Sequence, residues 1–192
     1  MKSHITVEII IETAAKLSNH VGLENLTLKM VADELKIKSP SLYNHISSLE
    51  EMKRLLMIYG WKNLETKMID AAIGVAGYQA LRNMCWAFYD YAINNKGVFN
   101  AMLWYNKYDN EEANQATQKL FDVLSKVMRP LYLSDDHINH SIRTLRSFLE
   151  GFALLVNNNA FGNPLSIQES FELSLTIIMN GIKSLEGEKE NA

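Results

Sequence analysis

The residues with the most usable chemistry lie in one short segment, Lys36–Glu51, which contains two helix-start signals. Ser39 is a favourable N-cap residue and Pro40 suits the first helical position, while the segment 47–50 (SSLE) has the form of a capping box. The helix between these two signals is short. Its hydroxyl, amide and imidazole side chains can bond to phosphate oxygens or to base edges.

The spacing around this segment predicts a helix-turn-helix. Thr27 can cap a helix that runs to Leu35, and a three-residue turn separates it from the short helix over 39–46. Leu42 and Ile46 are four residues apart and should pack on the preceding helix. The side chains then left outside are those of Pro40, Ser41, Tyr43 and Asn44, with His45 nearer the inner edge. Such a helix can enter the major groove of DNA, but an ordinary helical corner with a polar outer face has the same spacing.

The rest of the chain shows helical periodicity without useful strand alternation, so we predict an all-α protein of about nine helices. The predicted helices cover residues 7–21, 27–35, 39–46, 47–71, 78–95, 97–106, 110–128, 134–157 and 166–185.

The composition is that of an ordinary globular protein, with 47% hydrophobic and 21% charged residues and a formal net charge of −3. Residues 1–54 carry seven basic and seven acidic side chains, so charge alone does not suggest a nucleic-acid partner. The single cysteine, Cys85, excludes an intrachain disulfide. No segment approaches the roughly 18 apolar residues of a membrane span, and we expect a cytoplasmic protein.

The first 56 residues resemble the DNA-binding domain of the TetR family of bacterial transcriptional regulators. The segment 30–35 (MVADEL) stands where the family has "IA..LG", and 39–46 (SPSLYNHI) matches its "S..lY.HF" signature. The resemblance implies a DNA-binding domain over 1–47 and a helical ligand-binding and dimerisation domain over 48–188, joined by a helix that starts near residue 48. It implies a dimeric repressor that a largely apolar small-molecule ligand releases from a near-palindromic operator.

The resemblance also implies particular DNA contacts. Base contacts fall to Ser39, Pro40 and Tyr43, and phosphate contacts to Thr27, Ser41, Asn44 and His45. Basic residues complete the candidate set with Lys29, Lys38 and Lys53. Two alternatives stay open at this point: His45 can satisfy a local backbone group, and Lys38 can be a solvated turn residue.

Two residues depart from the family pattern. Lys36 occupies a turn position where glycine is usual, and Leu49 occupies the site of a lysine that commonly contacts phosphate. Lys53 or Arg54, one turn further on, can replace that lysine. Because the N-terminal segment is also neutral, we expect modest nonspecific DNA affinity and a shallow salt dependence.

The C-terminal region resembles one TetR subgroup more weakly, over 89–103 and 145–161. Glu150 stands where that subgroup has histidine, so no role of the histidine is carried over. Candidate ligand-binding residues are Trp86, Tyr89, Phe99, Met102, Trp104, Phe121 and Phe148, with Arg143 as an anchor for an anionic group. The alternatives are that the aromatic stripe is plain core, and that the arginines face solvent or, for Arg146, pair with Glu150.

The last two helices carry more apolar surface than one bundle needs, which predicts a four-helix homodimer interface. Its candidate residues are Phe152, Leu155, Phe171, Leu175, Ile178 and Ile182, unless these stripes are core within one chain.

We expect no cofactor and no metal site, since His137 and His140 share a helical face without further ligands. No enzyme motif is present. Two other hypotheses are a DNA-binding regulator whose C-terminal domain binds a protein, and a helical enzyme that has lost DNA binding.

Overall fold

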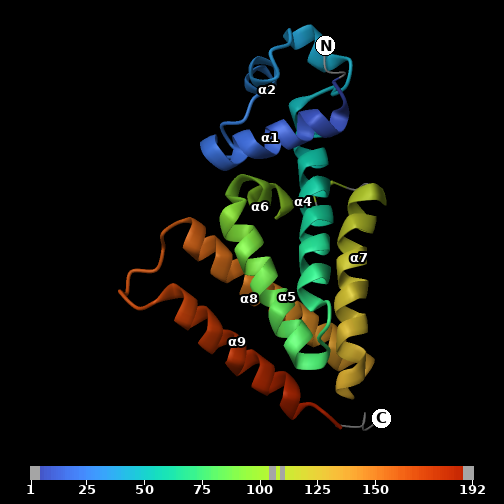
Figure 1. Cartoon of the computed structure of the whole chain (residues 1–192), viewed down its shortest axis with the longest axis vertical. Helices are drawn as coiled ribbons and strands as arrows, with labels where there is room; N and C mark the ends of the chain where they lie inside the picture. Colours follow the sequence, from blue (N-terminus) through green and yellow to red (C-terminus); the bar gives the residue numbers. More distant parts are fainter. Residues whose placement is uncertain (1–4, 104–106, 109–110, 188–192) are drawn as a thin grey trace. The chain divides into compact units, whose positions relative to one another are not determined.

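The chain is helical throughout the part that the computed structural model describes, which is residues 5–103, 107–108 and 111–187. These residues form nine α-helices and one 3₁₀ turn and contain no strand, which confirms the predicted all-α class. None of the helices in these ranges is long and apolar enough to cross a bilayer. In chain order the elements are α1 (Val7–Val21), α2 (Leu28–Glu34), α3 (Ser39–Tyr43), α4 (Leu49–Ala72), α5 (Gly77–Asn94), α6 (Lys96–Met102), α7 (Glu111–Met128), η2 (Arg129–Leu131), α8 (Asp135–Asn157) and α9 (Ile167–Ser184) (Figure 1).

The helices gather into two compact units. The first unit comprises Met1–Asn63 and Asn94–Thr117, and the second comprises Leu64–Ile93 and Gln118–Ala192. The first unit therefore holds α1, α2, α3, α6 and the beginning of α4, while α8 and α9 belong to the second. The functional division expected after residue 47 stays a prediction, because compactness does not assign a role to either part.

Local capping explains where the first two helices begin. The Thr6 hydroxyl accepts a hydrogen bond from the Ile9 amide at 3.4 Å, and the Thr27 hydroxyl accepts one from the Met30 amide at 3.2 Å. Gly22 ends α1 with φ of 85°, a conformation that favours glycine. The predicted cap at Thr27 and the predicted helix over 7–21 are confirmed.

The short helix α3 differs from its prediction in two ways. Lys38 is its N-cap residue, and Ser39 is already the first helical residue, so the Ser39 hydroxyl does not cap the helix. Instead, the Ser41 amide donates to the Lys38 carbonyl at 2.8 Å, which closes a tight first turn without a side-chain cap. The helix ends at Tyr43, earlier than the predicted residue 46.

The capping box of α4 lies one residue later than predicted. The Glu51 amide donates to the Ser48 hydroxyl at 3.0 Å, and the Glu51 carboxylate accepts bonds from the Ser47 amide at 2.6 Å and the Ser47 hydroxyl at 2.5 Å. These bonds to Ser47 lower the pKa of Glu51. Glu51 thus does the capping that the pattern assigned to Glu50, and Glu50 is left for a different contact.

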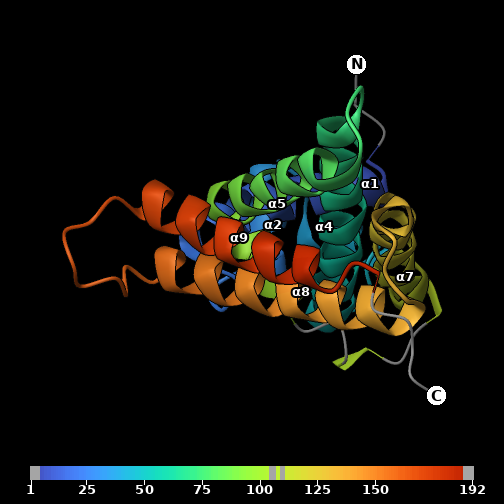
Figure 2. The same cartoon turned by 90° about the horizontal axis from the view of Figure 1, so that it is seen from below.

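An aromatic cluster around Phe171 forms the core of the second unit. The Phe171 ring centroid lies 4.4 Å from that of Tyr89, 4.6 Å from that of Trp86 and 5.3 Å from that of Phe152. These rings join α5 and α8 to α9. Helices α8 and α9 lie side by side and are connected by the loop over 158–166 (Figure 2).

Candidate nucleic-acid interface

Two buried side chains pack α3 against the helices that precede it. Leu42 and Ile46 are both fully buried, as is Val31 of α2. Helices α2 and α3 are in contact, as the helix-turn-helix pattern requires. The inward positions predicted from the four-residue spacing are therefore confirmed, and the opposite side of α3 is left to solvent.

The outward side chains form a polar face with one large aromatic ring. Tyr43 is 55% exposed, and Pro40, Ser41, Asn44 and His45 are exposed beside it. Among the other candidates, Thr27, Lys29 and Lys38 are exposed and Ser39 is half-buried. This face offers hydroxyl, amide, imidazole and ammonium donors for phosphates, and a tyrosine ring and hydroxyl for base edges.

The ring of His45 has no hydrogen-bond partner within the described part of the chain. The described contacts therefore give no support to the alternative in which His45 satisfies a neighbouring backbone group. Its exposed imidazole stays available to a ligand outside the chain, as the resemblance to the family pattern implies.

The turn between α2 and α3 keeps its shape without the glycine that the family pattern usually has there. Lys36 adopts a left-handed conformation with φ of 55°. Its amide donates to the Asp33 carbonyl, and the Ile37 amide donates to the Ala32 carbonyl, both at 3.0 Å. These two bonds end α2 in a Schellman motif, which offsets the roughly 1–2 kcal/mol that a left-handed non-glycine residue costs.

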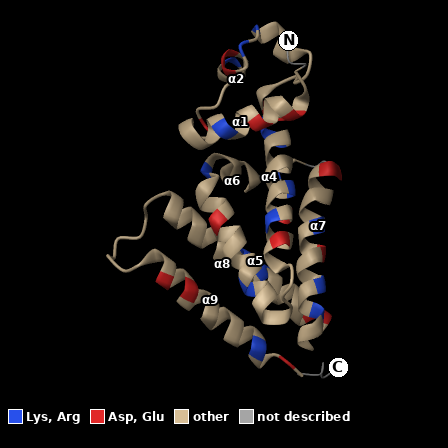
Figure 3. Ribbon diagram, in the orientation of Figure 1, with Lys and Arg blue, Asp and Glu red and all other residues tan. Residues whose placement is uncertain are grey.

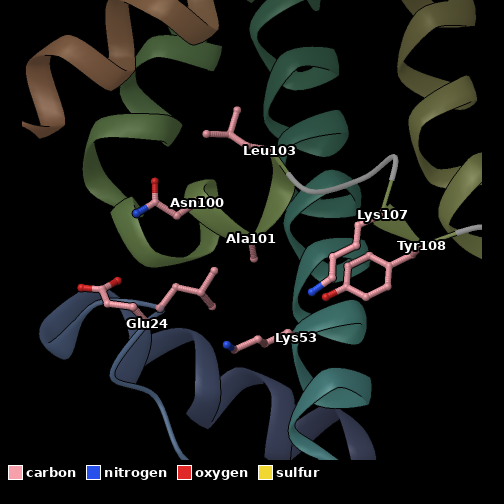
Figure 4. Close-up of a pocket in the computed structure, with 8 residues that line it drawn as sticks. Glu24, Lys53, Asn100, Ala101, Leu103, Lys107 and Tyr108 are labelled. Atoms are coloured by element: carbon pink, nitrogen blue, oxygen red, sulfur yellow. The ribbon is translucent and has the colours of Figure 1, made fainter.

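Lys53 occupies a different setting from the residues of α2 and α3. It is half-buried and lines a hollow of about 350 Å³ in the first unit (Figure 4). The other lining residues are Leu23, Glu24, Asn100, Ala101, Leu103, Lys107 and Tyr108. Its phosphate contact stays a prediction, since the structure gives this ammonium group a second possible role inside the hollow.

Glu50, freed from capping, holds the segment after α6. Its carboxylate accepts hydrogen bonds from Lys107 Nζ at 3.1 and 3.2 Å and from the Tyr108 hydroxyl at 3.2 Å. The bond from Lys107 lowers the pKa of Glu50. Burial, and then the negative charge of Glu50, raise the pKa of Tyr108 to about 12. This contact joins residues far apart in the sequence, so no local sequence pattern predicts it.

Charges of both signs cover the first unit. Lys or Arg and Asp or Glu are interspersed along α1 and α4 (Figure 3). Arg54 Nη1 lies 3.7 Å from the Glu112 carboxylate, and Lys62 Nζ lies 3.2 Å from it. Arg54, one of the two residues considered as a replacement for the missing lysine, is thus partly neutralised by Glu112. This is in keeping with the expected shallow salt dependence.

The candidate ligand residues are only partly brought together. Tyr89 is buried and joins the half-buried Trp86 and Phe148 around Phe171 in the second unit. The Trp86 ring nitrogen donates to Glu172 at 2.8 Å. These three aromatic residues therefore form a packed cluster, as the plain-core alternative expects, and their contact with a ligand stays a prediction.

The remaining candidates lie elsewhere. Phe99 and Met102 are buried in the first unit, and Arg143 is exposed on α8. Arg146 pairs with Glu150 at 2.7 Å, as the four-residue spacing predicts. Phe121 lines a hollow of about 280 Å³ with Asp122, Ser125, Arg129, Asp135, Ile138 and Asn139. Trp104 lies outside the described residues.

Three polar atoms that the candidate set missed lie buried on α8 without a partner in the described part of the chain, the third being Asn157 Oδ1 at the end of the helix. Ser141 Oγ and His137 Nδ1, one helical turn apart, have no hydrogen-bond partner among the described residues. Ser141 is 4% exposed. Buried polar atoms without partners cost free energy, so a polar group of a bound molecule or a water at this place would be stabilising. A serine within an otherwise apolar helical stripe was the signal in the sequence.

The expected dimer interface stays a prediction, and its six residues differ in exposure within one chain. Phe152, Phe171, Leu175 and Ile182 are buried within their own chain. Ile178 is half-buried, and Leu155 is 46% exposed. The exposed apolar side chains of the last two helices and their loop are Leu155, Phe161, Leu165, Leu173 and Ile177. The stripe chosen from the sequence was the one that packs inward, because periodicity does not distinguish two apolar faces of one helix.

Known proteins resemble this chain in sequence and in fold. A family model described as "Tetracyclin repressor-like, C-terminal domain" matches residues 81–178. The uncharacterized HTH-type transcriptional regulator YobS of Bacillus subtilis (strain 168) is 27% identical over 179 residues, which cover 93% of each chain.

Solved structures share the fold at low sequence identity. SCO7222, a TetR transcriptional regulator from Streptomyces coelicolor, has a TM-score of 0.76 at 16% identity and covers 95% of this chain and 100% of its own. ActR of Streptomyces coelicolor, solved in complex with actinorhodin, has a TM-score of 0.71 at 18% identity and covers 97% and 100%. At such identities the likeness concerns the fold alone.

Proposed function

Because the chain belongs to the TetR family of transcriptional regulators, we propose that it is a homodimeric repressor that a small molecule releases from a near-palindromic operator. The observation that carries the proposal is α3, a short helix fixed by Leu42 and Ile46 that presents Tyr43 and its polar neighbours to solvent. We place the protein in the cytoplasm, where an operator is accessible.

The second unit supports dimerisation through an exposed apolar face. Leu173 and Ile177 are 63% and 64% exposed and lie four residues apart on α9. Gly181 continues the same face, and a side chain added there would meet no atom within 4 Å. Apolar side chains beside a glycine allow a second helix to approach closely, so a symmetric pairing of α8 and α9 with those of a partner follows.

Ligand control is supported by the unpartnered polar atoms of α8. A largely apolar molecule with one hydrogen-bonding group would satisfy Ser141 Oγ or His137 Nδ1. ActR, which has the same fold, was solved with actinorhodin, and we extend small-molecule binding to this chain by that likeness. Such a ligand releases the operator if it binds more tightly to a conformation of the dimer in which the separation of the two α3 helices differs from that of the operator half-sites.

Selection of DNA from a random-sequence library tests the proposal. The wild-type protein is expected to enrich a near-palindrome. Tyr43→Ala is expected to lower the affinity for that site about 10- to 100-fold, because each base contact is worth roughly 1–3 kcal/mol. The melting temperature should stay unchanged, since Tyr43 is 55% exposed.

Tyr43→Phe separates the contribution of the hydroxyl from that of the ring, and Tyr132→Ala is a matched control at an 85% exposed tyrosine outside the proposed interface. If no sequence is enriched, or if Tyr43→Ala binds the enriched site as tightly as the wild type does, the assignment of α3 to DNA is wrong.

Restoring the missing lysine should strengthen DNA binding. Leu49→Lys places an ammonium group at the half-buried first residue of α4, where the family pattern has a lysine. One additional phosphate contact per protomer should make the slope of log K against log salt more negative by about 0.9 per contact. Fluorescence anisotropy at several salt concentrations measures this slope. Leu49→Gln, which lacks the charge, should keep the wild-type slope, and equal slopes for the lysine variant would contradict the prediction.

A further inference from the structure

Helix α6 has an unusual N-terminal cap, because the acceptor comes from another helix. Asn95, the residue at the N-cap position, makes no side-chain capping bond. Instead, Asn19 Oδ1 of α1 accepts hydrogen bonds from the Gly97 amide at 2.9 Å and the Val98 amide at 3.3 Å. Asn19 Nδ2 also donates to Asn95 Oδ1 at 3.3 Å. One side chain of α1 therefore satisfies the start of α6.

The backbones of α1 and α6 touch beside this cap. Gly97 is buried, and a Cβ atom on it would overlap the carbonyl group of Ser18 and lie 2.6 Å from the Ser18 hydroxyl oxygen. Ser18 is 1% exposed, and its hydroxyl donates to the Ala15 carbonyl at 2.9 Å. No side chain separates the two helices at this point, so their mutual angle is closely restricted. Figure 1 shows α6 beside α1.

Helix α4 holds the other side of α6. A Cβ atom on Gly60 would lie 2.7 Å from Met102 Cγ and 2.8 Å from Val98 Cγ1. Helix α6 has seven residues, too few to be stable alone in water. Its conformation therefore depends on α1 and α4, and any displacement of α6 must displace one of them or break these contacts.

We propose that Asn19 is a positioning residue that fixes the orientation of the DNA-binding helices through α6. Helix α6 contacts α1, α1 contacts α2, and α2 contacts α3. With Asn19 in place, α3 keeps one orientation relative to α6, and we expect the dimer to prefer one separation of operator half-sites. The inference rests on the proposed function, because half-site separation has meaning only for a dimer bound to DNA.

Removal of the cap should make the operator affinity less dependent on the separation of the half-sites. Asn19→Ala leaves α1 a good helix former but removes both acceptor bonds to α6. Hydrogen exchange at the Gly97 and Val98 amides should accelerate about 5- to 30-fold, which is the range that loss of an N-cap gives. Affinity should be measured for a series of operators whose half-sites are moved apart in single base-pair steps. The preference of the wild type for its best separation should fall about 5-fold or more in the variant.

Two variants and one control make this result specific. Asn19→Asp keeps an acceptor for both amides and should retain the wild-type preference. Asn114→Ala makes the same chemical change at an exposed position of α7 and should change neither measurement. If Asn19→Ala fails to fold, Asn19→Ser, whose side chain is too short to reach α6, takes its place.

The outcomes are distinguishable. If exchange accelerates but the preference for one separation persists, Asn19 only stabilises α6 and the proposal is overturned. If exchange does not change, Asn19 does not hold α6 at all, and the proposal is also overturned. A wild-type protein that binds no operator in the series refutes the proposed function instead, while the exchange measurement still reports on the cap.

Discussion

Replacing Ile177 by glutamate is expected to produce a monomer and to lower operator affinity by about 10²- to 10⁴-fold, the range in which a second linked site contributes to avidity. Ile177 is 64% exposed, so the substitution should leave the fold of a single chain intact. In a twofold-symmetric pairing of α9, the two glutamates would enter the same apolar interface. Their desolvation and mutual repulsion oppose association.

Sedimentation velocity measures the oligomeric state, and fluorescence anisotropy with the enriched operator measures the affinity. Ile73→Glu is the matched control, because Ile73 is 73% exposed just after α4 and lies outside the proposed interface. It should stay dimeric and bind as the wild type does. If Ile177→Glu were also dimeric with wild-type affinity, the interface would have to lie on another face.

Local sequence signals predicted most of the helices because each signal acts within a few residues. Thr27 caps α2 through its own hydroxyl, and Leu42 and Ile46 become buried because a four-residue spacing places them on one side of a helix. The same signals placed the cap of α4 one residue too early, because Ser48 and Glu51 form it in the structure. Adjacent serines and adjacent glutamates allow either register, and the choice depends on contacts that the local pattern does not contain.

Contacts between distant segments could not be predicted from spacing. The bond from the Gly97 amide to Asn19 and the bond from Lys107 to Glu50 each join residues more than 50 positions apart. Neither Asn19 nor Glu50 has an unusual local sequence. Similarly, the apolar residues of α9 form two faces, one buried with Phe171 and one exposed with Ile177, and only packing decides which face turns inward.

Gly97→Ala is expected to destabilise the fold. Its new methyl group cannot fit against the Ser18 carbonyl, and backbone atoms cannot move aside as a flexible side chain can. Alanine is favoured over glycine in a helix by about 1 kcal/mol, but overpacking of a buried site costs about 1–3 kcal/mol and occasionally more. With backbone as the obstacle, we expect a net loss of about 2 kcal/mol, or about 4–8 °C in melting temperature for a chain of this size.

Thermal unfolding followed by circular dichroism checks this prediction. Gly162→Ala is the control, since a Cβ atom there would meet nothing within 4 Å, and its melting temperature should stay within about 1 °C of the wild type. A Gly97→Ala protein as stable as the wild type would mean that α1 and α6 can separate freely. In that case Asn19 could not hold the two helices at one angle either, because a cap cannot fix helices whose backbones are free to part.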